Sequence, residues 1–259
     1  MPKKNHKVND FKIVIPARYA SSRFPAKPLA DLCGKPLLQH VYECACNSGA
    51  DTVIIATDDN RIAAVAEQFG AAVCMTSTDH ASGTDRIVEV AEKLNWQDDV
   101  VVVNLQGDEP LTPKQIIVQV ANNLHANPAA VCATLSAALT SRDDISNPNV
   151  VKVVADKNGF AMYFSRASIP YDRDQTIAAD DLSEYQRHIG IYAYRVGFLK
   201  EYALMPVCSL EKHEALEQLR ILWHGKKIHV QEAVALSGHG VDTPDDLQQV
   251  KAILEARSQ

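Results

Sequence analysis

The sequence of 259 residues has no long apolar run and few aromatic residues, at 6%. No stretch approaches the ~18 to 20 apolar residues that a membrane span requires, so no membrane partner is expected. The basic residues 1–10 are not followed by the apolar segment of a secretory signal, and we expect them to form a disordered tail. Hydrophobic residues at 46% and charged residues at 22% indicate an ordinary globular protein.

Several motifs of cofactor and metal chemistry are also missing. Neither G-x-x-x-x-G-K-[ST] nor G-x-G-x-x-G occurs, which disfavours a P-loop enzyme and a nicotinamide dehydrogenase. The nine histidines form no H-x-x-x-H or H-E-x-x-H pattern, so a zinc site is not expected. The six cysteines include no C-x-x-C pair and lie mostly among small apolar residues, which predicts reduced core thiols in a cytosolic protein.

The net charge of −6 argues against a nucleic-acid partner, but the charge is unevenly distributed. Residues 1–30 hold seven cations and one carboxylate, whereas the other 229 residues hold 19 cations and 31 carboxylates. An acidic protein with one cationic end raises the question of which anion that end binds.

Short β-branched runs alternate with longer helical patterns in the first half of the chain. Strands are predicted at 12–16, 52–56, 71–75 and 100–105, and helices at 35–48, 60–69, 83–95 and 113–125. The strands are nearly all apolar, which is typical of a parallel sheet covered on both faces. The pattern therefore predicts an α/β fold with a Rossmann-like, mainly parallel sheet flanked by helices.

The second half of the chain is richer in strands. Strands are predicted at 129–138, 150–155, 160–165, 188–194 and 227–234, helices at 210–224 and 244–257, and a polar loop at 172–187. No stretch resembles a linker. We therefore expect a single domain over residues 1–259, with a β-rich insertion in its second half.

Start signals mark two of the helices in the first half. Ser82 or Thr84 is expected to cap the helix at 83–95. Thr112 followed by Pro113 predicts a cap and a first-turn proline for the next helix.

A cationic loop follows the first predicted strand. It runs from Pro16 to Pro28 and carries Arg18, Arg23 and Lys27 with no carboxylate. Ligands of open α/β sheets bind at the carboxyl ends of the strands, where this loop is expected to lie. Small residues allow backbone N–H groups to approach an anion, and arginine offers bidentate contacts to phosphate. The loop is a candidate polyphosphate site, and a solvated basic loop is the alternative.

Carboxylates follow the fourth predicted strand in the segment NLQGDEP, residues 104–110. Asp108 is expected at the same edge of the sheet as the cationic loop. Mg²⁺ binds one or two carboxylates together with substrate phosphates, so Asp108 is a candidate ligand. A simple turn is the alternative, because Gly-Asp and Glu-Pro pairs are common in turns.

A further carboxylate precedes the last predicted helix. Thr243, Pro244 and Asp246 form a helix start with a cap, a first-turn proline and a capping-box acid. Asp242 stands before this cap and has no part in it. It is therefore a candidate second metal ligand.

Polar residues in the second half form a weaker constellation. Arg166 follows a strand, His188 and Tyr192 share one face of another, and Glu217 and Gln218 lie beside leucines in a predicted helix. Each also has an ordinary explanation as a strand end, a half-buried strand or a helix surface.

Taken together, the motifs resemble one family. PARYASSRFPAKPL (16–29), ATDD (56–59), TDHASGTDR (78–86), VNLQGDEP (103–110), NPNVVKVV (147–154), YFSRASIPYDRD (163–174), RHIGIYAYR (187–195), LEQLR (216–220) and GVDTPDDL (240–247) resemble the 3-deoxy-manno-octulosonate cytidylyltransferases, the CMP-Kdo synthetases. The resemblance covers residues 11 to about 255. One departure is Ala26, where the family usually has glycine, which predicts a stiffer loop with its chemistry intact.

The resemblance implies a nucleotidyltransferase fold and a Gram-negative, cytoplasmic enzyme, usually a homodimer. Its substrates would be CTP and Kdo, its products CMP-Kdo and pyrophosphate, and its cofactor Mg²⁺, in a step that activates Kdo for lipopolysaccharide biosynthesis. Residues of about 130–200 would bind the sugar and form the dimer. The alternatives are a related acid sugar, such as 8-amino-Kdo or a sialic acid, and a non-catalytic nucleotide-binding regulator.

The resemblance also implies roles for individual residues. The catalytic residues would be Arg18, Lys27, Asp108 and Asp242, of which Asp108 and Asp242 would bind the metal. The CTP site would comprise Ala17, Arg18, Ser22, Arg23, Lys27, Ser82, Gly83 and Arg86. The sugar site would comprise Gln106, Arg166, His188, Tyr192, Glu217 and Gln218. His188 is expected to position the substrate, and no protein group is nominated as the general base.

Overall fold

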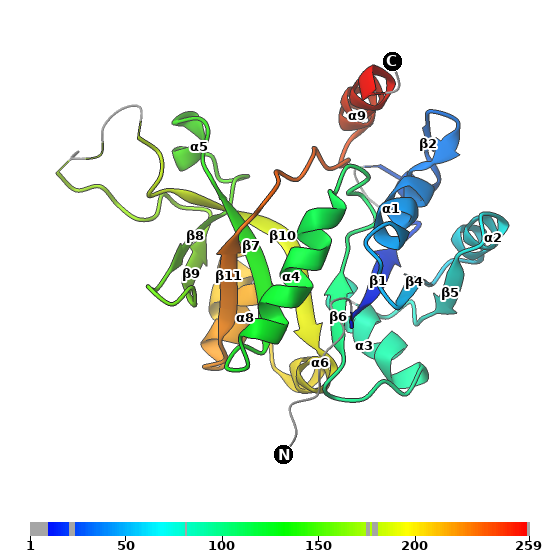
Figure 1. Cartoon of the computed structure of the whole chain (residues 1–259), viewed down its shortest axis with the longest axis horizontal. Helices are drawn as coiled ribbons and strands as arrows, with labels where there is room; N and C mark the ends of the chain where they lie inside the picture. Colours follow the sequence, from blue (N-terminus) through cyan, green and yellow to red (C-terminus); the bar gives the residue numbers. More distant parts are fainter. Residues whose placement is uncertain (1–9, 21–23, 81, 175–176, 178–180, 258–259) are drawn as a thin grey trace.

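The computed structural model describes residues 10–20, 24–80, 82–174, 177 and 181–257. Its centre is a nine-stranded sheet in which seven strands follow the order β11-β7-β10-β6-β1-β4-β5, while β8 pairs with β10 and β9 with β8 (Figure 1). The strands are β1 (Lys12–Ala17), β4 (Thr52–Thr57), β5 (Ala72–Met75), β6 (Val101–Asn104), β7 (Cys132–Ala138), β8 (Lys152–Ala155), β9 (Ala161–Ser165), β10 (Gln186–Arg195) and β11 (Ile228–Glu232).

Six of the seven strands from β11 to β5 in this order run in the same direction. β1 pairs in parallel with β4 and β6, β4 pairs with β5, and β7 pairs with β11. β10 is reversed, because it lies antiparallel between β6 and β7. The predicted fold class is confirmed, and the β-rich second half extends the same sheet rather than forming a separate layer.

Helices cover both faces of the sheet (Figure 1). α1 (Leu37–Cys46), α2 (Asn60–Gln68) and α4 (Lys114–Ala126) pack on one face, and α3 (Gly83–Lys93), α6 (Val196–Leu204) and α8 (Gln218–Trp223) on the other. The remaining elements are η1 (Lys27–Leu29), β2 (Asp31–Leu32), β3 (Lys35–Pro36), α5 (Asp143–Ser146), α7 (Ser209–Glu214) and α9 (Pro244–Arg257). Within the described ranges, no helix has the length and apolar character of a membrane span.

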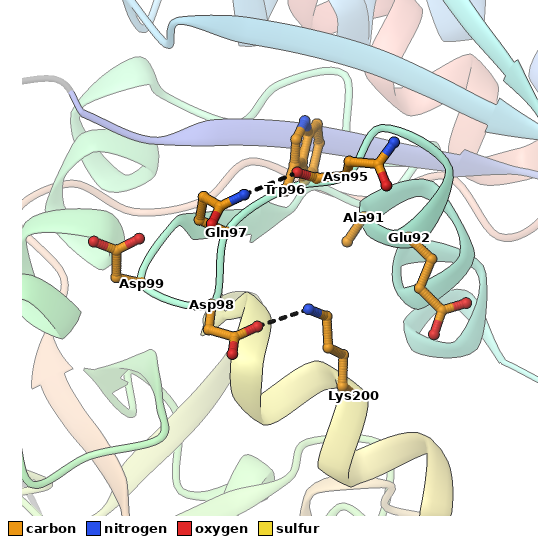
Figure 2. A pocket seen from close by; sticks show the side chains of 8 residues that line it. All are labelled: Ala91, Glu92, Asn95, Trp96, Gln97, Asp98, Asp99 and Lys200. Atoms are coloured by element: carbon orange, nitrogen blue, oxygen red, sulfur yellow. Dashed lines mark hydrogen bonds and ion pairs between the residues drawn. The ribbon is translucent and has the colours of Figure 1, made fainter.

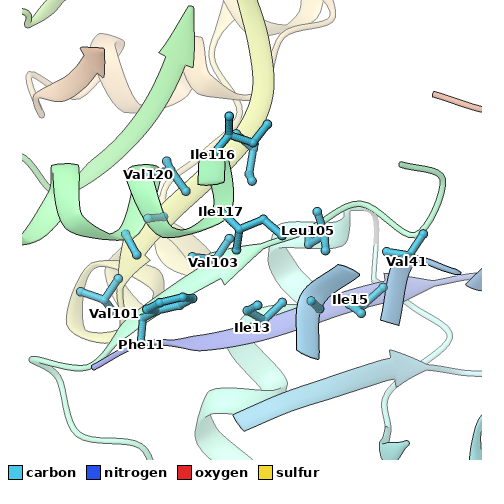
Figure 3. Packing of buried hydrophobic residues seen from close by; sticks show 14 of the residues in the cluster. Phe11, Ile13, Ile15, Val41, Val101, Val103, Leu105, Ile116, Ile117 and Val120 are labelled. Atoms are coloured by element: carbon cyan, nitrogen blue, oxygen red, sulfur yellow. The ribbon is translucent and has the colours of Figure 1, made fainter. Parts of the chain in front are cut away.

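Strand periodicity sends alternate side chains of β1 into two different cores. Ile13 and Ile15 belong to the core that includes Val41 of α1 and Ile117 of α4, as Figure 3 shows. Val14, between them, faces the opposite core. Both faces of the strand are fully buried, which explains why the run is apolar at every position.

A third, smaller core attaches the C-terminal helix. Leu247 and Val250 of α9 pack with Leu37, with Leu111 from the segment after β6, and with Val241. Val241 is fully buried although it lies in a loop. This core therefore brings the segment before α9 against the carboxyl end of β6.

The helix predicted at 35–48 begins only at Leu37, because its first two residues form a strand. Cys33 and Gly34 have φ angles of 53° and 82° and make the turn of the β2–β3 hairpin. Positive φ at both turn positions is typical of a two-residue hairpin. Cysteine rarely occupies such a position, so the turn was not predicted.

The helix predicted at 210–224 is in fact two helices, α7 and α8. Ala215 lies between them with φ 50° and ψ 49°, a left-handed conformation that ends α7. Leucines on both sides of the break point into one core, so their spacing does not reveal it. α6, which follows β10 directly, was not predicted from the sequence.

One predicted cap is correct and another is wrong. The Ser82 hydroxyl accepts a hydrogen bond from the Asp85 N–H at 3.1 Å and caps α3. Thr112 does not cap α4, because the helix begins at Lys114 and Pro113 occupies the cap position. Proline has no N–H and a fixed φ, so it stands readily just before a first turn.

All six cysteines are free thiols. Cys132 and Cys208 are buried as predicted, whereas Cys33 and Cys46 are exposed. The exposed pair lies in the β2–β3 turn and at the last residue of α1, so the prediction of core positions is wrong for both.

Candidate active site

A charged cluster, formed by Lys27, Asp108 and Asp242, lies where the segments after β1 and β6 meet the segment before α9. The Lys27 Nζ donates to Asp108 Oδ2 at 2.7 Å, to Asp242 Oδ1 at 3.3 Å and to the Val241 carbonyl at 2.8 Å. The Lys27 side chain is only 13% exposed, while both carboxylates have more access to solvent. Three residues selected from separate sequence motifs therefore meet at one point, which we call the Lys27 cluster.

Close backbone packing fixes Asp242 within this cluster. The Val241 N–H donates to the Asp108 carbonyl at 2.9 Å. A Cβ at Gly238 would lie 2.3 Å from the Leu111 Cβ, so only glycine allows this approach of the two segments. The capping box predicted for α9 is present, and Asp246 accepts hydrogen bonds from the Asp242 N–H and from Thr243.

The loop that presents Lys27 contains a left-handed residue. Ala26 has φ 57° and ψ 19°, and its N–H donates to the Tyr19 carbonyl at 3.0 Å. The Arg61 guanidinium stacks 3.3 Å above the Tyr19 ring and ties the loop to α2. Positive φ favours glycine, which gives a physical reason for the glycine usual in the resembling family and identifies Ala26 as a strained position.

A third carboxyl group, Glu109, lies next to the cluster and was missed. Burial, followed by repulsion from Asp108, raises the pKa of Glu109 to about 7. The Ser237 hydroxyl donates to Glu109 Oε2 at 3.4 Å, which links the segments after β6 and before α9. The Glu-Pro pair was interpreted only as part of a turn, and nothing local in the sequence marks this glutamate as buried.

The start of α3 meets the ends of β1 and β6. A Cβ at Gly83 would lie 3.2 Å from Pro16 Cγ and 3.9 Å from Gln106 Oε1. The Ser82 side chain is engaged in the capping box, so its hydroxyl serves the helix. Gly83 has no side chain and Ala17 is buried, so a ligand at the start of α3 would contact mainly their backbone atoms.

Arg86 lies behind this surface rather than on it. Its side chain is fully buried, and its guanidinium pairs with Asp58 at 2.8 Å. It also hydrogen-bonds the Thr76 hydroxyl and the Ser77 carbonyl. In this conformation Arg86 braces the ends of β4 and β5, so any effect on a ligand passes through these partners.

A polar cavity of about 240 Å³ is lined by residues of β10 and by Gln106, which lies two residues before Asp108 of the Lys27 cluster. We call it the β10 cavity. Its lining residues are Thr84, Asn104, Gln106, His188, Gly190, Tyr192, Tyr194, Ala215, Leu216, Glu217 and Gln218. Five of the six residues predicted for a sugar site therefore line the same cavity. Asn104 and Thr84 also line it, and they were not selected because they read as a strand end and a helix cap.

The ionisable groups of the β10 cavity favour their neutral forms. Burial lowers the pKa of His188 to about 3, and its Nε2 lies 3.1 Å from the Thr134 hydroxyl. Glu217 is exposed as a residue, but its carboxyl group lies in the cavity wall and accepts from the Thr84 hydroxyl at 3.2 Å. Burial of this carboxyl raises the pKa of Glu217. Burial therefore disfavours the charged forms of both His188 and Glu217 in this cavity.

Three buried polar atoms in the cavity wall lack a hydrogen-bond partner within the described part of the chain. They are Asn104 Oδ1, the Tyr192 hydroxyl and Gln218 Nε2. Buried polar atoms are normally paired, so unpaired ones in a cavity indicate positions that a ligand satisfies. One acceptor, one amide donor and one hydroxyl match a polyhydroxylated ligand.

Arg166 does not line the β10 cavity. Its Nε donates to the Glu214 carbonyl at 2.6 Å, and its two Nη atoms donate to the carbonyls of Pro148 at 2.8 Å and Ala215 at 3.5 Å. Ala215 itself is in the cavity wall. Arg166 therefore reaches the cavity only through Ala215, and its guanidinium hydrogen-bonds backbone carbonyls.

A larger hollow of about 660 Å³ lies elsewhere, between α3 and α6 (Figure 2). Asp98 and Asp99 precede β6, so this hollow is at the amino end of the strand, opposite the Lys27 cluster. Lys200 crosses it to pair with Asp98 at 2.6 Å. It contains none of the predicted site residues, and the chemistry is better placed at the carboxyl edge.

Comparisons with known proteins show which family the chain belongs to. A family model described as Cytidylyltransferase matches residues 12–228. The 3-deoxy-manno-octulosonate cytidylyltransferase of Vibrio parahaemolyticus is 56% identical over 250 residues, which cover 96% of this chain and 99% of the relative. That of Aliivibrio fischeri is 57% identical over 249 residues, covering 94% and 98%.

The chain belongs to the 3-deoxy-manno-octulosonate cytidylyltransferase family. A solved structure of CMP:2-keto-3-deoxy-manno-octonic acid synthetase complexed with CTP has a TM-score of 0.88 and 43% identity, and the match covers 95% of this chain and 99% of that one. This family of cytidylyltransferases consists of nucleotidyltransferase enzymes, as the resemblance implied.

For this cytidylyltransferase family member, the structure brings some of the predicted residues together and separates others. Lys27, Asp108 and Asp242 form one cluster, and five predicted sugar residues form the adjoining cavity. Arg86 and Arg166 hold neighbouring structure instead. Arg18 is partly exposed at the end of β1, and Ser22 and Arg23 lie outside the described residues.

Proposed function

We propose that the chain transfers CMP from CTP to the anomeric hydroxyl of 3-deoxy-D-manno-octulosonate (Kdo), giving CMP-Kdo and pyrophosphate. The observation that carries this proposal is the pairing of the Lys27 cluster with the β10 cavity at the carboxyl edge of one sheet. One site suits phosphate charge, and the other suits the hydroxyls of a sugar. The names of the relatives support the same reaction.

The nucleotide would lie across the ends of β1 and α3. Arg18 and Lys27, with Ser22 and Arg23, are proposed to hold the triphosphate, because cations and backbone N–H groups there match its charge. Ala17, Ser82 and Gly83 would bound the cytidine through backbone. Arg86 would support this surface from behind, through Asp58.

The residues of the Lys27 cluster fit a magnesium ion. Asp108 Oδ2, Asp242 Oδ1 and the Val241 carbonyl converge on one point, the Lys27 Nζ, and all three are hard oxygen donors. The cluster supplies two carboxylates, Asp108 and Asp242. Among the described residues, no group of three or more histidine, cysteine or carboxylate side chains is placed to hold a metal ion. Mg²⁺ accepts this arrangement and takes its other ligands from water and phosphates. When bound by Asp108 and Asp242, it would neutralise phosphate charge.

The sugar is proposed to fill the β10 cavity. Gln106, His188, Tyr192, Glu217 and Gln218 would contact its hydroxyls, because all five line the cavity. Arg166 is proposed to bind the sugar carboxylate by exchanging its long contact with the Ala215 carbonyl, at 3.5 Å, for a charged acceptor.

In this reaction the protein forms no covalent bond to the substrates. A bond forms between the anomeric oxygen and the α-phosphorus, the bond to pyrophosphate breaks, and the hydroxyl proton leaves. Catalysis then consists of in-line positioning and charge neutralisation. With its pKa lowered to about 3, His188 is too weak a base to take this proton, so we assign it a positioning role.

Pyrophosphate release is the direct test. Release is expected only when CTP, Kdo and Mg²⁺ are present together, and its absence under those conditions refutes the proposal. Replacing Kdo with 8-amino-Kdo and with a sialic acid tests the alternative that a related acid sugar is the substrate. Higher kcat/KM with one of these sugars would reassign the substrate within the same reaction.

We also propose a cytoplasmic homodimer that takes CTP and Kdo as its small-molecule partners and binds no nucleic acid. The segment of about 130–200 includes two large exposed apolar side chains, Met162 at 65% and Tyr171 at 81%. Light scattering after size exclusion should give twice the chain mass of 28.4 kDa. A monomer at micromolar concentration would contradict this part of the proposal.

A further inference from the structure

A buried lysine that no step above uses lies behind the β10 cavity. Lys152 begins β8, and its side chain is 0% exposed. Its Nζ donates three hydrogen bonds, to the carbonyls of Asn147 at 2.9 Å, Val150 at 2.6 Å and Arg166 at 2.8 Å. An ammonium group has three donors, so each is satisfied.

The acceptors of Lys152 are all backbone carbonyls. None of the ion pairs among the described residues includes Lys152, and burial lowers its pKa. Burying a charge without a carboxylate partner is unfavourable, so an apolar residue would be the ordinary choice here. The ammonium joins the 147–150 loop to the end of β9, two segments that the Arg166 guanidinium also links through the Pro148 carbonyl at 2.8 Å.

Lys152 fixes Arg166 at its backbone. The Arg166 carbonyl accepts from Lys152, and the Arg166 N–H donates to Glu214 Oε2 at 2.9 Å. The same glutamate accepts from the Ser165 hydroxyl at 2.6 Å. With its backbone held on both sides, Arg166 directs its guanidinium to the carbonyls that end α7.

Those carbonyls belong to the left-handed break between α7 and α8. The residues immediately after the break, Leu216, Glu217 and Gln218, form one wall of the β10 cavity. The same Lys152 loop also reaches the other wall, because the Val151 carbonyl accepts from the His188 N–H at 2.8 Å. The two walls are therefore connected through the backbone that Lys152 organises.

We propose that Lys152 is a positioning residue for the acid-sugar subsite, acting through Arg166 and the α7–α8 break on one wall and through the His188 backbone on the other. This inference rests on the proposed function of the β10 cavity as the sugar site. It assigns Lys152 no contact with CTP, whose proposed site lies at the ends of β1 and α3.

The test compares the two substrates in steady-state kinetics. Lys152→Met keeps the length of the side chain and removes the three donors, so KM for Kdo should rise at least tenfold while KM for CTP changes less than twofold. Lys152→Arg keeps the charge and should restore part of the Kdo affinity. Lys200→Met removes a lysine at the opposite edge of the sheet and should leave both constants unchanged.

A second variant covers the case in which Lys152→Met does not fold. Glu214→Ala removes the acceptor on the other side of Arg166 while leaving Lys152 in place, and it should raise KM for Kdo selectively. Equal changes in both KM values, or no change in either variant that folds, overturn the inference while the proposed function stands. A wild-type protein that does not turn over Kdo refutes the proposed function and the inference with it.

Discussion

The Lys27 cluster and the β10 cavity share the segment after β6, yet they are built on different principles. The cluster is made of charges that the protein already balances, and it is assembled from loops. The cavity is made of polar groups carried mainly by a strand and a helix break, and three of its buried atoms are unpaired among the described residues. An anionic ligand that binds the cluster must therefore replace ion pairs that already exist. A hydroxylated ligand that binds the cavity can instead pair with polar atoms that have no partner among the described residues.

The largest effect is expected from the cluster. Asp108→Asn removes a carboxylate from both Lys27 and the proposed magnesium site, so kcat should fall by about 100- to 1,000-fold. The melting temperature should change by only a few degrees, because the side chain is partly exposed. Asp98→Asn, which removes a carboxylate paired with Lys200 at the opposite edge, serves as the control. Near-wild-type turnover in Asp108→Asn would remove this residue from the metal site.

Gly238→Ala tests the packing that holds Asp242 in the cluster. The new Cβ would lie 2.3 Å from the Leu111 Cβ, so the segment before α9 must shift. We expect kcat/KM to fall by about tenfold or more, since displacements of about 1 Å at a reacting centre have effects of this order. Turnover and thermal unfolding, measured together, separate this shift from global unfolding. Unchanged kinetics would show that the approach of the two segments has no role.

The same substitution in the β10 cavity should act on one substrate only. A Cβ at Gly190 meets nothing within 4 Å, so Gly190→Ala should leave stability unchanged while placing a methyl group in the cavity. KM for Kdo should rise by about tenfold, the effect of one methyl group in a fitted pocket, with KM for CTP constant. A parallel rise in KM for CTP would contradict the separation of the two regions.

The neutral state of His188 has a consequence for acid stability. The unfolded chain protonates this histidine near its ordinary pKa of 6.5, but the folded protein does so only near 3. The free energy of unfolding should therefore decrease as the pH falls from 6.5 towards 3, by up to about 1.4 kcal/mol per unit from this residue. Urea unfolding of His188→Gln should show a shallower decrease over that range. Parallel curves for the two proteins would show that His188 is not buried in its neutral form.

The smallest effect is expected at Ala26. Its φ of 57° is unfavourable for a residue with a Cβ, so Ala26→Gly should raise the free energy of unfolding by about 0.5 to 1 kcal/mol. Denaturant titration checks the sign. A decrease would mean that the added freedom of the unfolded chain outweighs the relief of strain.

Regular patterns in the sequence were sufficient for the sheet. The apolar run of β1 predicted burial on both faces, and the capping box before α9 was predicted from its residues, while Ser82 was one of two candidates for the cap of α3. The rule that ligands bind at the carboxyl ends of the strands predicted that Lys27 and Asp108 lie at the same edge of the sheet. These signals are local or follow from general sheet topology.

The features that escaped prediction depend on distant contacts. Ala215 ends α7 in a left-handed conformation that nothing in its own sequence requires, and Arg166 stabilises it from another element. Burial of Arg86 follows from its pairing with Asp58, which is 28 residues away. The unpaired oxygen of Asn104 becomes visible only when the cavity around it is known.

The position of Lys27 between two carboxylates has a thermodynamic consequence. A triphosphate that binds Lys27 competes with partners already within hydrogen-bond distance, so the number of ion pairs changes little on binding. Attraction of this kind depends less on ionic strength than attraction to an unpaired cation on an open loop. The affinity for nucleotide should therefore depend mainly on how well the triphosphate and its metal replace Asp108 and Asp242 around the Lys27 ammonium group. Long-range attraction of anions to the basic end of the chain should contribute less.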